Sequence, residues 1–570
     1  MLQAHLLAQQ GAARAANPGT ETVTGEIEGV KFAGVVAPDR AVSSYVLVMT
    51  NRVFVSNSRA QLASLVRATQ GKLPALAAED EYRYFRQKYP RDQSTETAFL
   101  VLTDATIRRW CGPQWRIADS RRTRVAALMA ELQAAHLGDL VTGKATEVDL
   151  RPAANLVDPG ALRLTKSGVT SATYGTLDFM TPIVELGLTQ VTRAEADAYG
   201  RWRDNYQRNW RQFFDPIAVR FSVAPDRVGV QLAVMPLIAA SDYRQFLDYT
   251  LGARMEPTAG DPHTNVLARL GIAINTQSEG LKSAGSFLGN LAPGLRANPL
   301  GWVGSSLTLY ADEDPFWDRL LAATNAQVML NQSYHQLPVA LHVEVRNPLG
   351  VVAFLTALRA FADQSAPGMA NWQNLEHRGR AYVKITSTQR SEDPDEPEWS
   401  IFYAVSPKAL TVTLNETLLQ RALDRQGATN ETAGGPTSVG PSWLGGNLGL
   451  MAGRRFLDVV QATSRNDYEA QLRLLAWGNL PVLNEWRRLY PEQDPVKLHE
   501  AWWGSRLLCP AGGTYVWNER WRTMESTVCG HPGEPKPVPA APLAGVSFGN
   551  LGVTFENHGL SAQAILERHP

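Results

Sequence analysis

Segments in which apolar and polar residues alternate recur along this chain, and they come in matched groups. Alternation with a period of two predicts a strand, and apolar residues three or four positions apart predict a helix. The first group predicts three strands and then a helix, at residues 30–36, 44–48 and 53–56 and through Leu62, Leu65 and Val66. A second group of the same kind comes later, at residues 381–385, 399–405 and 409–414 and through Leu418, Leu419 and Leu423. Ser58 and Asn415 stand where the first free amides of each helix need an acceptor, so we expect both to be N-caps.

Two further pairs of segments follow these groups in the same order. A strand that leads into a helix is predicted at 97–102 and again at 447–451, and a β-hairpin at 217–234 and again at 551–566. The matched blocks are offset by about 350, 350 and 330 residues, and self-similarity of this kind is typical of a duplicated unit. We therefore predict two tandem related units, at residues 1–240 and 241–570.

The second predicted unit begins with strand–helix pairs that the first unit lacks. These strands are predicted at 306–310 and 339–345, and nothing before residue 28 matches them. We therefore expect the first unit to lack its N-terminal part, which an upstream segment or a protein partner would complete. Because the predicted strands alternate and are joined mainly by hairpins, we expect antiparallel sheets packed by helices, that is, an α+β fold.

Composition narrows the function classes. Of the 570 residues, 44% are hydrophobic and 19% are charged, which is enough apolar material for large cores and too little charge for a disordered chain. The 55 basic and 55 acidic residues leave no net charge, so no overall field would attract nucleic acid or an anionic membrane. No apolar run approaches the roughly 20 residues that span a bilayer. We therefore expect no membrane span, and the balanced charge argues against a nucleic-acid partner.

Motifs of common catalytic sites are scarce. His499-Glu500 is followed by Ala-Trp-Trp and does not make the HExxH motif of zinc proteases, and no Ser-x-x-Lys motif is present. The ten histidines are scattered, without a pair at ligand spacing on one predicted helix. We predict no catalytic residue, no cofactor and no metal site, and we interpret the chain as a non-catalytic binding or structural protein. A hydrolase whose site is assembled from distant residues stays open as the alternative.

A helix rich in aromatic and basic residues is predicted at 193–214. Thr192 and Glu195 have the spacing of a capping box, and the aromatic residues that follow fall on one stripe. The arginines around that stripe are Arg201, Arg203, Arg208 and Arg211. Arginines among aromatics can hold phosphates and stack bases, so these four form a candidate interaction surface, and nucleic-acid binding is a further alternative. The stripe is also typical of a helix packed against a sheet, which is the interpretation that we favour.

Several stretches carry a resemblance to a known family. They are RVFVSNSRAQLASLV, LPALAAEDEYRYFRQKYP, YQRNWRQFFDPIAVRF and LGVTFENHGLSAQAIL. These stretches resemble a family of large, mostly exported bacterial proteins of unknown function. The resemblance implies an extracytoplasmic α+β protein, periplasmic or secreted, and it carries over no functional residue.

The segment 505–535 contains two of the three cysteines. Its Cys-Pro-x-Gly-Gly-x-Tyr opening, from Cys509 to Tyr515, and its later Cys-x-His resemble the C-terminal end of bacterial type IV pilins and pseudopilins, where this part is a short extracellular hairpin. Cys509 and Cys529 flank a predicted hairpin, and we expect a disulfide between them, which would suit an oxidising compartment. Cys111 would then stay a free thiol.

Overall fold

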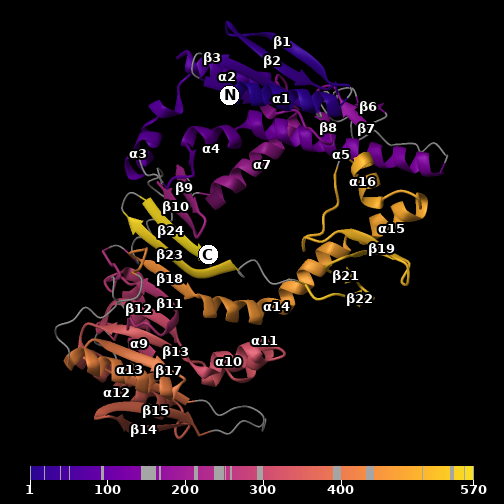
Figure 1. The fold of residues 1–570 in the computed structure, drawn as a ribbon. Helices are drawn as coiled ribbons and strands as arrows, with labels where there is room; N and C mark the ends of the chain where they lie inside the picture. The colour runs from indigo at the N-terminus through magenta and orange to yellow at the C-terminus, as the bar shows by residue number, and fades with distance from the viewer. Residues whose placement is uncertain are drawn as a thin grey trace. The chain divides into compact units, whose positions relative to one another are not determined.

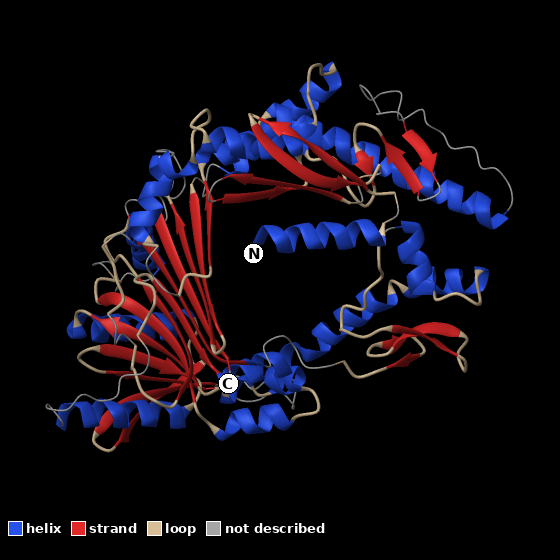
Figure 2. Ribbon diagram, turned by 45° about the horizontal axis from the view of Figure 1, so that its top comes forward, coloured by secondary structure: helices blue, strands red, loops and turns tan. Residues whose placement is uncertain are grey.

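The structure of the protein is a computed structural model, drawn in Figures 1 and 2. It describes residues 2–17, 19–38, 40, 42–49, 52–91, 95–142, 162–165, 168–210, 216–235, 250, 252–256, 260–291, 299–388, 400–431, 442–503, 505–538, 545–556 and 559–568. The chain forms two compact units, each assembled from separate stretches of sequence. The N-terminal unit comprises Met1–Tyr84, Thr103–Asn209 and Glu469–Pro539, and the sheet unit comprises Phe85–Leu102, Trp210–Tyr468 and Ala540–Pro570.

The N-terminal unit begins with a helix and a four-stranded antiparallel meander, in the order β1-β2-β3-β4. The helix α2 follows this meander, and its predicted N-cap is confirmed, since Ser58 Oγ accepts from the amide of Gln61 at 3.2 Å. Leu62 and Val66 of α2 are fully buried in a core with Leu47 of the meander. The elements are α1 (Leu2–Ala16), β1 (Glu21–Ile27), β2 (Val30–Val36), β3 (Ser43–Met49), β4 (Arg52–Ser56) and α2 (Arg59–Thr69).

Three further cores lie in the described part of the N-terminal unit, the smallest of them around Trp486 and Leu498. One joins the long helix α5 to a small sheet, with Val125 and Met129 packed against Tyr174. Another surrounds a hairpin, where Leu483 packs against Met524. The remaining elements are η1 (Leu76–Ala78), α3 (Asp80–Lys88), which runs into the sheet unit, α4 (Asp104–Cys111), α5 (Pro113–Thr142), β6 (Leu162–Thr165), β7 (Gly168–Ser171), β8 (Gly175–Thr176), η2 (Ile183–Glu185), α7 (Arg193–Trp210), α15 (Leu480–Leu489), α16 (Pro495–Trp503), β19 (Tyr515–Asn518), β20 (Thr523–Ser526), β21 (Gly530–His531) and β22 (Glu534–Pro535).

One large sheet organises the sheet unit. Its 13 strands, among the residues that the structure describes, are hydrogen-bonded in the order β14-β15-β16-β17-β13-β12-β11-β18-β23-β24-β10-β9-β5, and each described pair is antiparallel. Figure 2 shows these strands side by side in red. Their bounds are β5 (Ala98–Leu102), β9 (Ile217–Ala224), β10 (Arg227–Val234), β11 (Val266–Ala273), β12 (Val303–Asp312), β13 (Val339–Val345), β14 (Ala370–His377), β15 (Arg380–Ser387), β16 (Ser400–Val405), β17 (Ala409–Thr413), β18 (Leu448–Gly453), β23 (Val546–Glu556) and β24 (Gly559–Arg568).

The C-terminal strands lie in the middle of this sheet. β23 pairs with β18, and β24 pairs with β10, so the yellow hairpin in Figure 1 joins strands from distant parts of the sequence. The β9–β10 and β23–β24 hairpins therefore stand next to each other, with β5 and β18 on their outer sides. Pairing of this kind needs the whole chain, because the strands that meet are more than 300 residues apart in sequence.

Helices pack on both faces of the large sheet. α13 lies on one face, where Leu418 packs against Tyr310 and Ala340, and Asn415 caps it as predicted by accepting from the amide of Leu418 at 3.0 Å. α12 and α10 lie on the other face. The helices of this unit are α9 (Glu279–Leu291), α10 (Pro315–Ala322), α11 (Ala326–Gln332), η4 (Tyr334–Gln336), α12 (Pro348–Ser365), α13 (Glu416–Glu431) and α14 (Arg454–Trp477), which runs on into the N-terminal unit.

The predicted α+β class with mainly antiparallel sheets is confirmed. The compact units differ from the expected tandem units, because residues 469–539, which contain the hairpin expected within 505–535, fold with the N-terminal unit. The tandem repeat itself stays a prediction. Residues 557–558, within the second predicted hairpin at 551–566, lie outside the described residues.

Candidate functional site

The large sheet has one face made only of apolar residues over nine adjacent strands. Two neighbouring rows of side chains cross these strands from β13 to β5, and we call them together the apolar face. The first row is Leu341, Leu309, Leu270, Leu450, Leu551, Ala564, Val230, Phe221 and Ala98. The second row is Val343, Leu307, Ile272, Leu448, Val553, Ala562, Leu232, Val219 and Leu100.

The middle of the apolar face is open. Leu309 is 43% exposed and Leu450 is 40% exposed, although both lie in interior strands of the sheet. Their neighbours along the chain point to the opposite face, because side chains alternate along a strand, and Tyr310 there is only 1% exposed. In most antiparallel sheets with one wet face, the apolar side is the buried one. This sheet has the reverse arrangement.

Two helices pack on the apolar face at β12 and β13, on either side of Leu309 and Leu341. α12 shares a core with Val343 of the second row, which is only 7% exposed. α10 packs on the other side, where Phe316 contacts Ala311 in a separate core. The residues between these two helices, such as Leu309, keep their exposure.

The opposite face of the sheet mixes polar residues with glycines and apolar residues such as Met451, and we call it the polar face. Its polar residues are Arg220, Gln231, Gln563, Asn550, Arg269, Tyr310, Thr308, His342 and Thr411. Thr308 and Thr411 are each 1% exposed and flank His342 in register on three adjacent strands. Burial lowers the pKa of His342 and so favours its neutral form.

A buried ionic cluster joins α13 to the polar face. The guanidinium of Arg425 donates to Asp261 at 2.6 Å and to Asp312 at 3.2 Å, and Tyr310 donates to Asp261 at 3.0 Å. His263 Nε2 lies 2.6 Å from the second oxygen of Asp312. Burial by itself would raise the pKa of Asp261, but the hydrogen bonds and charge of Arg425 outweigh it, so that pKa is lowered. Because these charges bind one another, we interpret the cluster as a structural link and not as a catalytic centre.

A tryptophan seals the polar face beside this cluster. Trp443 lies against two glycines in adjacent strands, so close that a Cβ on Gly449 would come within 2.2 Å of its ring and one on Gly271 within 2.9 Å. Arg269 stacks over the same ring, with 4.9 Å from its guanidinium carbon to the ring centre. Trp443 therefore closes the polar face over β11 and β18.

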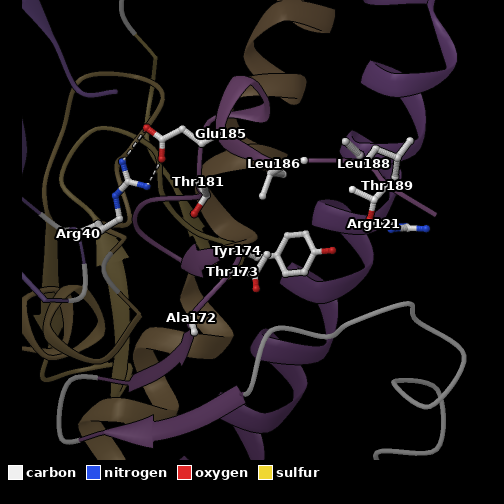
Figure 3. A pocket seen from close by; sticks show the side chains of 12 residues that line it. Arg40, Arg121, Ala172, Thr173, Tyr174, Thr181, Glu185, Leu186, Leu188 and Thr189 are labelled. Atoms are coloured by element: carbon white, nitrogen blue, oxygen red, sulfur yellow. Dashed lines mark hydrogen bonds and ion pairs between the residues drawn. The ribbon is translucent and has the colours of Figure 1, made fainter. Parts of the chain in front are cut away.

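The N-terminal unit contains a separate cavity of about 360 Å³, shown in Figure 3. Its charged lining residues are already engaged: Arg40 donates to Glu185 at 2.7 Å, and Arg121 donates to Glu195 at 2.8 Å. Tyr174 lines the cavity with backbone and small side chains around it. The cavity shows no paired nucleophile and base among the residues that line it.

A second hollow of about 490 Å³ lies in the sheet unit at the ends of β12 and β13. Glu344 lines it and accepts from the amide and hydroxyl of Ser305 at 3.0 and 2.8 Å and from the hydroxyl of Ser306 at 3.1 Å. These bonds fix the carboxylate within the strands, so it is not poised as a free base.

Three of the four predicted interaction-surface arginines lie on α7, and Arg211 lies outside the described residues. Arg201 is exposed, Arg203 donates to Asp204 at 3.1 Å, and Arg208 donates to the backbone oxygen of Asp204 at 3.3 Å. The neighbouring aromatic residues pack within the N-terminal unit. Trp202 stacks on Tyr206 with ring centres 5.0 Å apart, Tyr199 donates to the backbone oxygen of Cys111 at 2.9 Å, and Arg116 lies over Trp202. Tyr199, Trp202 and Tyr206 are half-buried, and their contacts outside α7 are with α4 and α5. The interaction surface stays a prediction.

The expected disulfide is wrong for this structure. Cys509 and Cys529 are both free thiols, as is Cys111. Cys509 and Cys529 are buried in the core around Leu483, and Cys509 Sγ lies 3.2 Å from Ser526 Oγ. Burial raises the pKa of Cys529, and the neighbouring Cys509 raises it further, so both sulfurs pack here as small apolar groups.

A serine in the large sheet lies in a sequence that matches a known catalytic motif. Residues Gly545 to Gly549 read Gly-Val-Ser-Phe-Gly, which fits the Gly-x-Ser-x-Gly pattern of a nucleophile elbow. Ser547, however, lies inside the long antiparallel strand β23 and not at a strand-to-helix turn. The context that would present this serine as a nucleophile is therefore absent at this position.

Comparison with known proteins gave no match. No family model, no curated protein and no solved structure matches this chain. The resemblance to exported bacterial proteins therefore stays a prediction. Within the described residues, no helix has both the length and the apolar character that crossing a membrane requires.

Proposed function

We propose that the protein is a non-catalytic binding protein whose large sheet takes up an apolar ligand on the apolar face. A single observation carries this proposal, namely that Leu309 and Leu450 are about 40% exposed in interior strands of the sheet, although their chain neighbours Tyr310 and Met451 are buried on the opposite face. Apolar residues scattered singly on a surface need no explanation, but a continuous apolar area marks a binding site.

The size of the apolar face fits this role. Nine strands about 4.8 Å apart span roughly 38 Å, and the two rows give a footprint on the order of 500 Å². The largest apolar patch on a typical monomer is roughly 300–600 Å² and is often functional. Covering about 200 Å² of such a surface contributes roughly 5 kcal/mol before the entropic cost of binding.

The energetics of the fold point in the same direction. Arg269 and Tyr310 are buried on the polar face, where each polar group needs a hydrogen-bond partner. Leu309 and Leu450 stay exposed to solvent, so the fold does not gain the free energy of burying them. If stability alone determined which face α13 covers, Leu309 and Leu450 would be on the covered face. The reversed order is explained if the apolar face is kept open for a ligand.

Binding of 1-anilinonaphthalene-8-sulfonate (ANS) by the folded protein tests this proposal. We expect enhanced fluorescence with the wild-type protein and its loss in the double variant Leu309→Asn/Leu450→Asn, because asparagine disrupts the apolar surface without adding charge. Leu349→Asn is the matched control, since Leu349 is 83% exposed in the first turn of α12 and lies outside the two rows. Circular dichroism must show all three proteins folded. A folded wild-type protein without ANS enhancement, or equal enhancement in the double variant, would refute the proposal.

A further inference from the structure

We infer that the apolar face binds the hydrocarbon chain of a single lipid or fatty acid molecule. This inference rests on the proposed function and deepens it, by naming the chemical class of the ligand.

The first reason is the absence of hydrogen-bonding groups along the apolar face. All eighteen positions of the two rows carry hydrocarbon side chains, and the backbone groups of these interior strands are already used in the ladder. An extended peptide laid on such a face would bury its own amides and carbonyls without partners, at a cost for each group. A hydrocarbon chain has no such groups to satisfy.

A protein partner is disfavoured for a related reason. Protein–protein interfaces contain about one hydrogen bond per 100–200 Å² and are enriched in aromatic residues and arginine. The two rows contain one aromatic residue, Phe221, and no residue that can donate or accept from its side chain. The apolar face therefore offers contact area, but it lacks the polar contacts that would hold a protein partner in one defined position.

The second reason is the length of the apolar face. Its span of roughly 38 Å follows from nine strands about 4.8 Å apart. The hydrocarbon core of a bilayer is about 30 Å thick and holds two acyl chains end to end, so one chain extends roughly 15 Å. The apolar face is therefore long enough for at least one fully extended acyl chain.

The third reason distinguishes a single lipid molecule from a membrane surface. α10 and α12 pack on the same side of the sheet at β12 and β13, with Leu309 and Leu341 between them. A helix with its side chains is about 10 Å in diameter, so the floor formed by Leu309 and Leu341 lies below the tops of these helices. A flat bilayer would meet the helices first, whereas a single chain can lie between them.

Displacement of ANS by fatty acids tests the inference with the full-length protein. We expect palmitate to displace ANS and decanoate to do so at least tenfold more weakly, because each added methylene tightens binding by up to about fourfold. Leu309→Asn/Leu450→Asn should weaken palmitate binding at least tenfold in calorimetry, and Leu349→Asn should leave it unchanged within twofold.

The other outcomes separate the two levels of the proposal. ANS binding that palmitate does not displace would overturn the hydrocarbon-chain inference and leave the proposed function standing, whereas a folded protein that binds neither probe would overturn both. A wild-type dimer that Leu309→Asn/Leu450→Asn converts to a monomer, without palmitate binding, would assign the apolar face to a second copy of the chain. Flotation with phosphatidylcholine vesicles in the absence of palmitate binding would assign it to a membrane surface. Either result would overturn the inference.

Discussion

Glu195 provides a prediction whose magnitude can be worked from the structure. Its side chain is 7% exposed, and Arg121 holds it with two hydrogen bonds of 2.8 Å. Arg124 and the amide of Thr192 each add one at 2.9 Å. These hydrogen bonds, led by Arg121 and opposed by burial, lower the pKa of Glu195 from its ordinary 4.5 to about 2.

The lowered pKa makes Glu195 a stabilising group above its unfolded pKa. Each pKa unit corresponds to about 1.4 kcal/mol, so the ionised carboxylate contributes about 3 kcal/mol to the unfolding free energy at pH 7. Because the folded pKa lies below the unfolded one, this contribution is complete above pH 4.5 and is lost as the pH falls toward 2. Glu195→Gln removes the charge and keeps the shape, so it should cost about 3 kcal/mol at pH 7 and about 1.5 kcal/mol at pH 3.

Hydrogen exchange of peptides from α5 and α7 measures this locally, since the protein has two units and need not unfold in one step. Glu485→Gln is the control, because Glu485 pairs with Arg488 on an exposed surface of α15, where such pairs contribute less than about 1 kcal/mol. The difference between wild type and Glu195→Gln should shrink between pH 7 and pH 3. A difference that stays constant over this range, or one no larger than that of Glu485→Gln, would refute the electrostatic reasoning.

Three further predictions follow from the packing. Arg425→Met should lower the unfolding free energy of the sheet unit by about 3 kcal/mol in urea titrations, because it leaves the buried carboxylate of Asp261 without its guanidinium, whereas Asp312 keeps Arg421 at 3.5 Å; a loss below about 1 kcal/mol would show that the cluster is not a structural link. Gly449→Ala should cost about 1–3 kcal/mol and change the fluorescence of Trp443, since the added methyl meets its ring; an unchanged melting temperature would contradict this close packing. Cys509 and Cys529 should react with iodoacetamide without reductant only after unfolding, as read by mass spectrometry; peptides linked through the two sulfurs would contradict the free thiols.

Two of the strands that sequence reasoning missed, β1 and β14, have little apolar alternation. β1 and β14 each form the outer strand of a meander, and most of their side chains are exposed or half-exposed. Strands at a sheet edge bury little, so their sequences carry polar residues on both faces and lack the period-two signal. Interior strands such as β2 and β17 were predicted closely because burial imposes that signal.

The apolar face could not be read from the sequence for a different reason. The alternation in β12 predicted a strand with an apolar side, and the ordinary inference is that this side is buried. The sequence contained no sign that Tyr310 would be buried and that Leu309 would be exposed to solvent. Which face is covered depends on which residues and helices pack on it. Gly449 is one example, because its lack of a side chain makes room for Trp443 on the polar face.

The sequence by itself determined the local elements, the caps at Ser58 and Asn415 and the α+β class, because these depend on periodicity and on hydrogen bonds between near neighbours. Only the tertiary structure decided that β24 pairs with β10, that the segment 469–539 folds with the N-terminal unit, and that two buried cysteines stay reduced. It also decided that nine strands align their apolar residues on one open face. Contacts between residues hundreds of positions apart leave no periodic trace in the chain, and the apolar face depends on such contacts where β10 meets β24 and β11 meets β18.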